Sequence, residues 1–228
     1  MLERAPFRWW HDHRWGVKAL SAMGRTAEAL AYAEASKGRN DSLASIAATC
    51  ESILLASGRW EDAYSRYGIV ATTGTTYLAV FRALVKKYPL KAPREILQDL
   101  AMSEPGNEGK WFAAAKDAGL YDEALQLAAR SATDPRTLTR AARDCGIKRP
   151  EFALQCGLMA LHWISLGFGY ELTSEDVRSA YEAAVAAAAA AQILLDQVQT
   201  RTRSILAMGG PQSAFIVATL KAELAVST

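Results

Sequence analysis

Cysteine is scarce in this 228-residue chain, and neither sign of charge dominates it. The three cysteines, Cys50, Cys145 and Cys156, are odd in number and scattered, unlike the paired frameworks of small secreted domains. We therefore expect reduced thiols and a cytoplasmic location. Lys and Arg number 26 against 24 Asp and Glu, a net charge of +2 that excludes a strongly basic nucleic-acid coat.

Signals for membrane insertion are weak. Charged residues occur between Glu3 and Asp12 before any apolar run, so no signal-peptide core is expected there. Residues 152–170 carry no formal charge over nineteen positions, which is close to the length that spans a bilayer. Polar residues and glycines interrupt this run, and Glu151 and Glu171 flank it. We expect a buried helix, and no membrane span.

Motifs of catalysis are also missing. The sequence has no nucleophile elbow, phosphate-binding loop, H-E-x-x-H or C-x-x-C pair. His162 stands alone in an apolar segment, as a hydrogen-bonded core histidine does. We therefore expect no enzyme activity, no cofactor and no metal.

Helical periodicity is the strongest positive signal. Strand-like alternation is rare, alanine and leucine dominate, and apolar residues recur at spacings of three, four and seven. The pattern predicts a single all-α domain over 1–228. Repeat-like helical pairs fill 1–131, and longer C-terminal helices in 132–228 pack on that stack.

Three segments repeat one another: "ALSAMGRTAEALAYA", "ILLASGRWEDAYSRY" and "AAKDAGLYDEALQLA". Each has a glycine that is expected to end one helix in a left-handed cap, then an acid favourable to the dipole of the next helix, then a small residue that permits close packing. The three sets are Gly24, Glu28 and Ala29; Gly58, Asp62 and Ala63; and Gly119, Glu123 and Ala124.

The spacing of these glycines resembles the tetratricopeptide repeat (TPR) family, because Gly24 and Gly58 lie 34 residues apart. The resemblance covers about 10–71 and 108–131 and implies a TPR-like α-solenoid. Such stacks commonly hold a protein segment or subunit, so it also implies a non-catalytic scaffold or adaptor in a larger complex. The glycine–aromatic–alanine core of the motif is formed by Gly58, Trp60 and Ala63, and by Gly119, Tyr121 and Ala124.

The opening stretch "FRWWHDHRW" concentrates tryptophan and arginine. His11 and His13 are two residues apart and cannot share a helix face, so a metal site is not expected. The aromatics either seal the end of the first repeat or bind a partner, since Trp and Arg anchor interfaces. The candidate partner-binding residues are Arg8, Trp9, Arg14, Trp60, Tyr64 and Tyr67.

A basic stripe offers an alternative function. Arg136, Arg140 and Arg143 fall on one face of a predicted helix, and Lys148 and Arg149 follow it. This face is either plain solvent surface or a contact for the phosphates of a nucleic acid.

The segment from Thr173 to Gly209 has no interior glycine or proline. It is predicted to form one helix roughly 50 Å long, beginning at a Thr173 or Ser174 cap. Eight alanines in 183–191 suit close packing, so self-association through the 175–207 helix is a further possibility.

Overall fold

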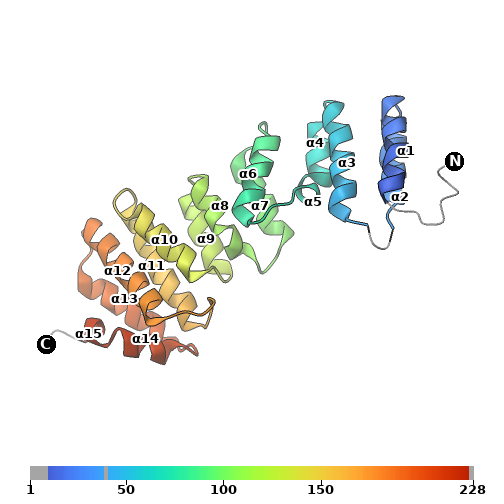
Figure 1. The fold of residues 1–228 in the computed structure, drawn as a ribbon. Helices are drawn as coiled ribbons and strands as arrows, with labels where there is room; N and C mark the ends of the chain where they lie inside the picture. Colours follow the sequence, from blue (N-terminus) through green and yellow to red (C-terminus); the bar gives the residue numbers. More distant parts are fainter. Residues whose placement is uncertain (1–9, 39–40, 226–228) are drawn as a thin grey trace. The chain divides into compact units, whose positions relative to one another are not determined.

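The computed structural model describes residues 10–38 and 41–225, which form helices joined by turns (Figure 1). No β-strand occurs in these ranges, which confirms the all-α prediction. The chain divides into two compact units, Met1–Ile96 (unit 1) and Leu97–Thr228 (unit 2), each described below by itself. The prediction of a single domain stays a prediction. Within the described ranges, no helix has the length and apolar character needed to cross a bilayer.

Unit 1 is built from consecutive helices that pair along the chain. In the second of these pairs, the helix after the turn contains a π-helical turn, η2, between two short α-helical pieces. The elements are α1 (Trp10–Ala22), α2 (Thr26–Ala35), α3 (Leu43–Ala56), α4 (Trp60–Ala63), η2 (Tyr64–Gly68), α5 (Ile69–Ala71), α6 (Tyr77–Lys87) and the start of α7 (Pro93–Ser103).

Unit 2 continues from α7 with hairpins in which α11 packs against α9, α10, α12 and α13. The buried α11 is the centre of this unit, and most of its side chains are excluded from solvent. The elements are η3 (Glu108–Trp111), α8 (Phe112–Asp117), α9 (Tyr121–Arg130), α10 (Pro135–Cys145), α11 (Pro150–Ser165), α12 (Ser174–Ala190), α13 (Leu195–Ala207), α14 (Ser213–Thr219) and α15 (Lys221–Leu224).

The predicted glycine corners are confirmed. Gly24, between α1 and α2, has a φ of 74° and belongs to a Schellman cap: its N–H donates to Ser21 O at 3.0 Å, and Arg25 N–H donates to Leu20 O at 3.0 Å. Gly58 and Gly119 form the same pair of bonds at φ of 72° and 75°. The small residues of the motif, Ala29, Ala63 and Ala124, are fully buried.

The acid after each glycine has a local role. Glu28 and Asp62 occupy the first turns of α2 and α4, and each pairs with the arginine three residues before it. This arginine immediately precedes the helix, so the ion pair holds the arginine side chain against the first helical turn. The third corner has Leu120 at that position and lacks the ion pair.

The prediction of one helix from Thr173 to Gly209 is wrong. The start is as predicted, since Thr173 forms a capping box with Asp176. However, the helix ends at Ala190, and Gln192 adopts a φ of 58° in a cap of the Schellman type. Half of the eight alanines in 183–191 are buried within unit 2, Ala184 and Ala187 completely, whereas Ala186, Ala189 and Ala190 are exposed. Part of the surface on which the self-association hypothesis depended is therefore internal, and the hypothesis stays a prediction.

Candidate interaction site

The aromatic partner candidates of unit 1 are mostly internal. Arg8 and Trp9 lie outside the described residues. Arg14 and Trp60 are half-buried, whereas Tyr64 and Tyr67 are each only 8% exposed. Tyr64 and Tyr67 belong to the π-helical turn, which directs both rings into unit 1.

The polar groups next to the π-helical turn form their hydrogen bonds within unit 1. Tyr67 donates to Glu34 at 2.5 Å, and Arg66 donates to the same carboxylate oxygen at 2.8 Å. Burial raises the pKa of Tyr67 most, and the hydrogen bond to Glu34 raises it further. The Tyr64 ring meets the Tyr88 ring edge to face, with centroids 5.0 Å apart. The two tyrosines thus serve the core, and little of their surface is left for a partner.

The opening stretch contributes one core residue and one exposed one. Trp10 is buried, and its indole N–H donates to Ser45 Oγ at 3.1 Å, as an end seal would. Trp15 is 59% exposed, with the Lys18 ammonium 5.5 Å from its ring centroid. His13 lies beside the Tyr32 hydroxyl at 2.9 Å. The described part of the chain contains no cluster of three or more potential metal ligands.

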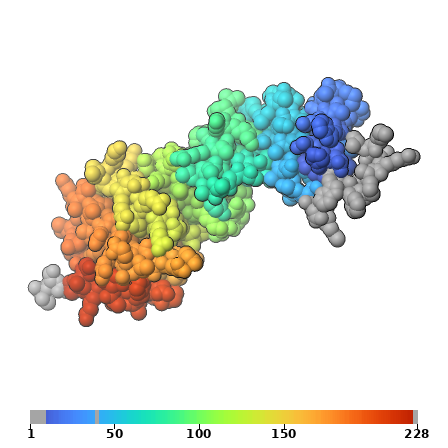
Figure 2. All heavy atoms as spheres, in the orientation of Figure 1, coloured from blue at the N-terminus to red at the C-terminus, as the bar shows by residue number. Residues whose placement is uncertain are grey.

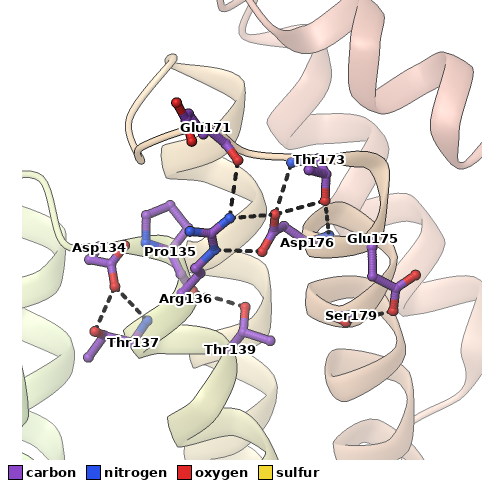
Figure 3. A network of polar contacts seen from close by, with 10 residues as sticks. All are labelled: Asp134, Pro135, Arg136, Thr137, Thr139, Glu171, Thr173, Glu175, Asp176 and Ser179. Atoms are coloured by element: carbon purple, nitrogen blue, oxygen red, sulfur yellow. Dashed lines mark hydrogen bonds and ion pairs between the residues drawn. The ribbon is translucent and has the colours of Figure 1, made fainter.

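The residues of the basic stripe of unit 2 fall into two groups, since, among the described residues, Arg136 forms an intramolecular ion pair and the others do not. Arg136 lies in the first turn of α10, where its guanidinium donates to both carboxylate oxygens of Asp176 at 2.7 and 3.0 Å (Figure 3). A third bond, of 3.1 Å, reaches the backbone oxygen of Glu171. Glu171 itself has a φ of 44°, which is rare outside glycine. Arg136 therefore joins the start of α10 to the loop before α12 and to α12 itself.

Asp176 is the centre of this network. Its hydrogen bond with Arg136, and next the bonds from Thr173, hold the pKa of Asp176 well below its usual range, although burial opposes them. The same carboxylate accepts from Thr173 N–H at 2.9 Å, which completes the capping box. Arg136 is thus committed to an intramolecular pair and is poorly placed for a phosphate.

Replacing Asp176 by asparagine should change how stability depends on pH. Because the pKa of Asp176 is lower in the folded than in the unfolded state, its ionised form stabilises the fold at pH values above the ordinary aspartate pKa, about 4. This contribution decreases as the pH falls from that value toward the folded-state pKa. We expect D176N to cost about 1–2 kcal/mol at pH 7 and less at pH 3, measured by urea denaturation. In the control E175Q, the altered side chain has a hydrogen bond to Ser179 of 3.4 Å, and the cost should be small at both pH values. An equal cost of D176N at pH 7 and pH 3 would contradict this role of the pair.

The remaining basic residues are exposed. Arg140, Arg143 and Lys148 form no ion pair with any described residue. The guanidinium of Arg149 stacks on Tyr121, 4.5 Å from the ring centroid. Figure 2 shows α10, in yellow, open on the visible face of unit 2. This part of the stripe is free to contact a ligand.

A cleft of about 530 Å³ lies beside these residues. Its walls come from the start of α9, the corner between α10 and α11, and the end of α12. Leu125, Pro150 and Phe152 give it apolar surface, while Lys148 and Arg149 border it. We refer to this site as the corner cleft.

The sequence alone does not reveal the corner cleft, because the residues of its walls lie up to 70 positions apart along the chain. One local signal lies beside it, because Lys148 and Arg149, which follow the basic stripe in the sequence, line the cleft. Ile147, which precedes them, is 92% exposed. Comparisons with family models, curated proteins and solved structures gave no match for the chain.

Proposed function

We propose that this chain is a non-catalytic interaction protein, an adaptor or scaffold subunit built on a TPR-like helical repeat. The glycine corners and the buried alanines at Ala29, Ala63 and Ala124 support the repeat. Helix pairs that stack through such corners give extended surfaces that suit the binding of a protein segment.

The observation that carries the proposal is the exposed surface around the corner cleft. Ile147 is a large apolar residue that is almost wholly in solvent, and Lys148, an exposed cation without an ion pair to any described residue, follows it in the chain. Arg143, exposed in the same way, lies four positions before Ile147 at the end of α10. Apolar surface next to charged groups is typical of interaction sites, and a cleft gives a partner something to fill.

A nucleic acid is the second candidate for this surface, and the structure favours it less. Arg136 is paired with Asp176, so one of the five cations of the stripe is already neutralised within the chain. Asp122 and Glu151 also line the corner cleft, where their carboxylates would repel phosphates. The ring of Tyr121 is covered by Arg149 and is not free to stack on a base.

Purification of the tagged full chain from its native host tests the proposed function. We expect a partner protein in a fixed ratio, a complex heavier than one chain by light scattering, and cross-links between the partner and the chain. A monomeric chain without any stoichiometric partner would overturn the proposal. Binding to RNA or DNA whose affinity falls log-linearly with salt, and whose slope drops in an Arg140, Arg143 and Lys148 variant, would favour the nucleic-acid function instead.

A further inference from the structure

A second groove of unit 2 lies between α11 and α13, two helices that pack against each other. It has a volume of about 290 Å³ and shares Gln155 with the corner cleft. The residues that line it come from one face of each helix. They are Gln155, Leu158, Met159 and His162 of α11, and Thr200, Arg201, Ser204 and Ile205 of α13. We refer to this site as the α11–α13 groove.

The polar side chains of the α11–α13 groove are mainly hydrogen-bond donors. Arg201 is exposed and forms no ion pair with a described residue. The Thr200 hydroxyl likewise has no hydrogen bond within the described ranges, whereas Ser204 Oγ donates to the backbone oxygen of Thr200 at 3.0 Å. A guanidinium without a partner and a free hydroxyl on one helix face suit an acceptor supplied by a ligand.

The carboxylates of the two helices lie beyond the groove. Glu151 in α11 and Asp196 in α13 each come four residues before the first lining residue of their helix. The Asp196 carboxylate accepts from Gln197 N–H at 2.8 Å, at the start of α13. A cation without a lining carboxylate gives the α11–α13 groove a positive charge, so it favours an anion. The corner cleft differs, because two carboxylates line it.

His162 belongs to this groove. The sequence pattern predicts a hydrogen-bonded core histidine, but the structure places the ring half-buried in the groove wall. The imidazole contacts the Trp163 ring, with centroids 5.0 Å apart, and forms no hydrogen bond with a described residue. Burial lowers the pKa of His162, so the ring is neutral at pH 7 and has one N–H to donate.

The size and charge of the groove restrict what it can hold. Leu158, Met159 and Ile205 give it apolar surface, and its volume is near the lower end of the range for ligand sites, about 300 Å³. With His162 neutral, Arg201 supplies the single charge of the lining. A carboxylate matches one guanidinium through two parallel hydrogen bonds. A phosphate monoester carries a charge of about −1.5 to −2 and would require a second cation.

We propose that the α11–α13 groove binds a small organic monoanion, a carboxylate attached to an apolar body. The carboxylate pairs with Arg201 and accepts hydrogen bonds from His162 and Thr200. The apolar body covers Leu158, Met159 and Ile205. This ligand site goes beyond the proposed interaction function and does not depend on it.

Titration of the isotope-labelled full chain with octanoate tests the proposal by two-dimensional NMR. We expect saturable shifts of the backbone amide signals in 155–162 and 200–205, with a Kd on the order of 0.1–1 mM for a ligand of this size. Octanamide lacks the charge, and acetate lacks the apolar body, so each should bind at least about 10-fold more weakly. Octyl phosphate should bind no more tightly than octanoate.

Matched variants separate the site from net charge. Arg201→Gln should weaken octanoate binding at least about 10-fold, and His162→Phe, which keeps a ring without an N–H donor, about 3- to 10-fold. Arg178→Gln removes the same charge from an exposed arginine of α12 that does not line the groove, and it should leave the affinity within about 2-fold. Arg201 and Arg178 are both exposed, so their replacement tests the site without disturbing the core.

Several results would overturn the monoanion site. They are the absence of saturable shifts below about 10 mM octanoate, shifts confined to other parts of the chain, equal affinities for octanoate and octanamide, and equal effects of Arg201→Gln and Arg178→Gln. Tighter binding of octyl phosphate would contradict the assignment of a single negative charge. None of these results bears on the interaction function, which the purification of a partner complex tests separately.

Discussion

Replacing Glu51 by alanine is expected to lower the free energy of unfolding by about 2–4 kcal/mol, because a buried hydroxyl loses its acceptor and a partly exposed ammonium loses its carboxylate. The Glu51 side chain is only 5% exposed, and its carboxylate accepts from the Lys87 ammonium at 3.0 and 3.1 Å. It also accepts from the hydroxyl of Tyr88 at 2.5 Å, and Tyr88 is almost completely buried. Alanine would leave the hydroxyl without its acceptor, and among the described residues the ammonium would keep Thr72 alone as a partner.

The chain provides a matched control in Glu34. This carboxylate has the same kind of partners, Tyr67 at 2.5 Å and Arg66 at 2.8 Å, but its side chain is 48% exposed. Water can replace its bonds, so Glu34→Ala should cost less than about 1.5 kcal/mol. Urea denaturation followed by circular dichroism compares the two. Similar costs for the two alanine variants would show that burial does not govern these networks.

Replacing Gly157 by alanine is expected to destabilise unit 2 by about 1–3 kcal/mol, because the close contact of α11 with α12 leaves no room for a methyl group. A Cβ at Gly157 would lie 2.8 Å from Ala184 Cβ and 3.0 Å from both Ala184 Cα and N. The higher helix propensity of alanine, worth up to about 1 kcal/mol, offsets only part of this cost. The urea midpoint of the full chain measures the effect.

A double-mutant cycle identifies the contact as the cause. Ala184→Gly removes the nearest clashing atom, so Gly157→Ala/Ala184→Gly should cost less than the sum of the two single variants, by about 1 kcal/mol. Rescue is partial, since the α12 backbone at Ala184 remains close. Strict additivity would mean that the helices separate freely and that this close approach is not required.

The parts of the fold that carry a clear local residue signal agree with the sequence prediction. A glycine after an apolar helix pattern, followed by an acid and an alanine, indicates a corner because only neighbouring residues take part in it. The corners at Gly24, Gly58 and Gly119 and the cap at Thr173 belong to this class. The all-α class follows from the same local periodicity.

The parts that lack a local residue signal, or that depend on distant contacts, were not predictable in this way. Gln192 occupies a left-handed corner without the usual glycine, so the break between α12 and α13 carries no residue signal. The stripe pattern predicts that Arg136 either faces solvent or contacts a phosphate, whereas its partner in the structure, Asp176, is 40 residues away. Tyr67 likewise has its acceptor 33 residues away on α2, and the burial of its ring depends on that packing.

The three corner glycines have a consequence for chain chirality. Nothing lies within 4 Å of a Cβ added at Gly24, Gly58 or Gly119, so room does not restrict these positions. Their positive φ is the sole reason that an L-residue is disfavoured there. A mirror-image residue such as D-alanine has its preferred conformation at that φ. These turns thus require a left-handed backbone conformation, and glycine adopts it readily because it is achiral and has no Cβ.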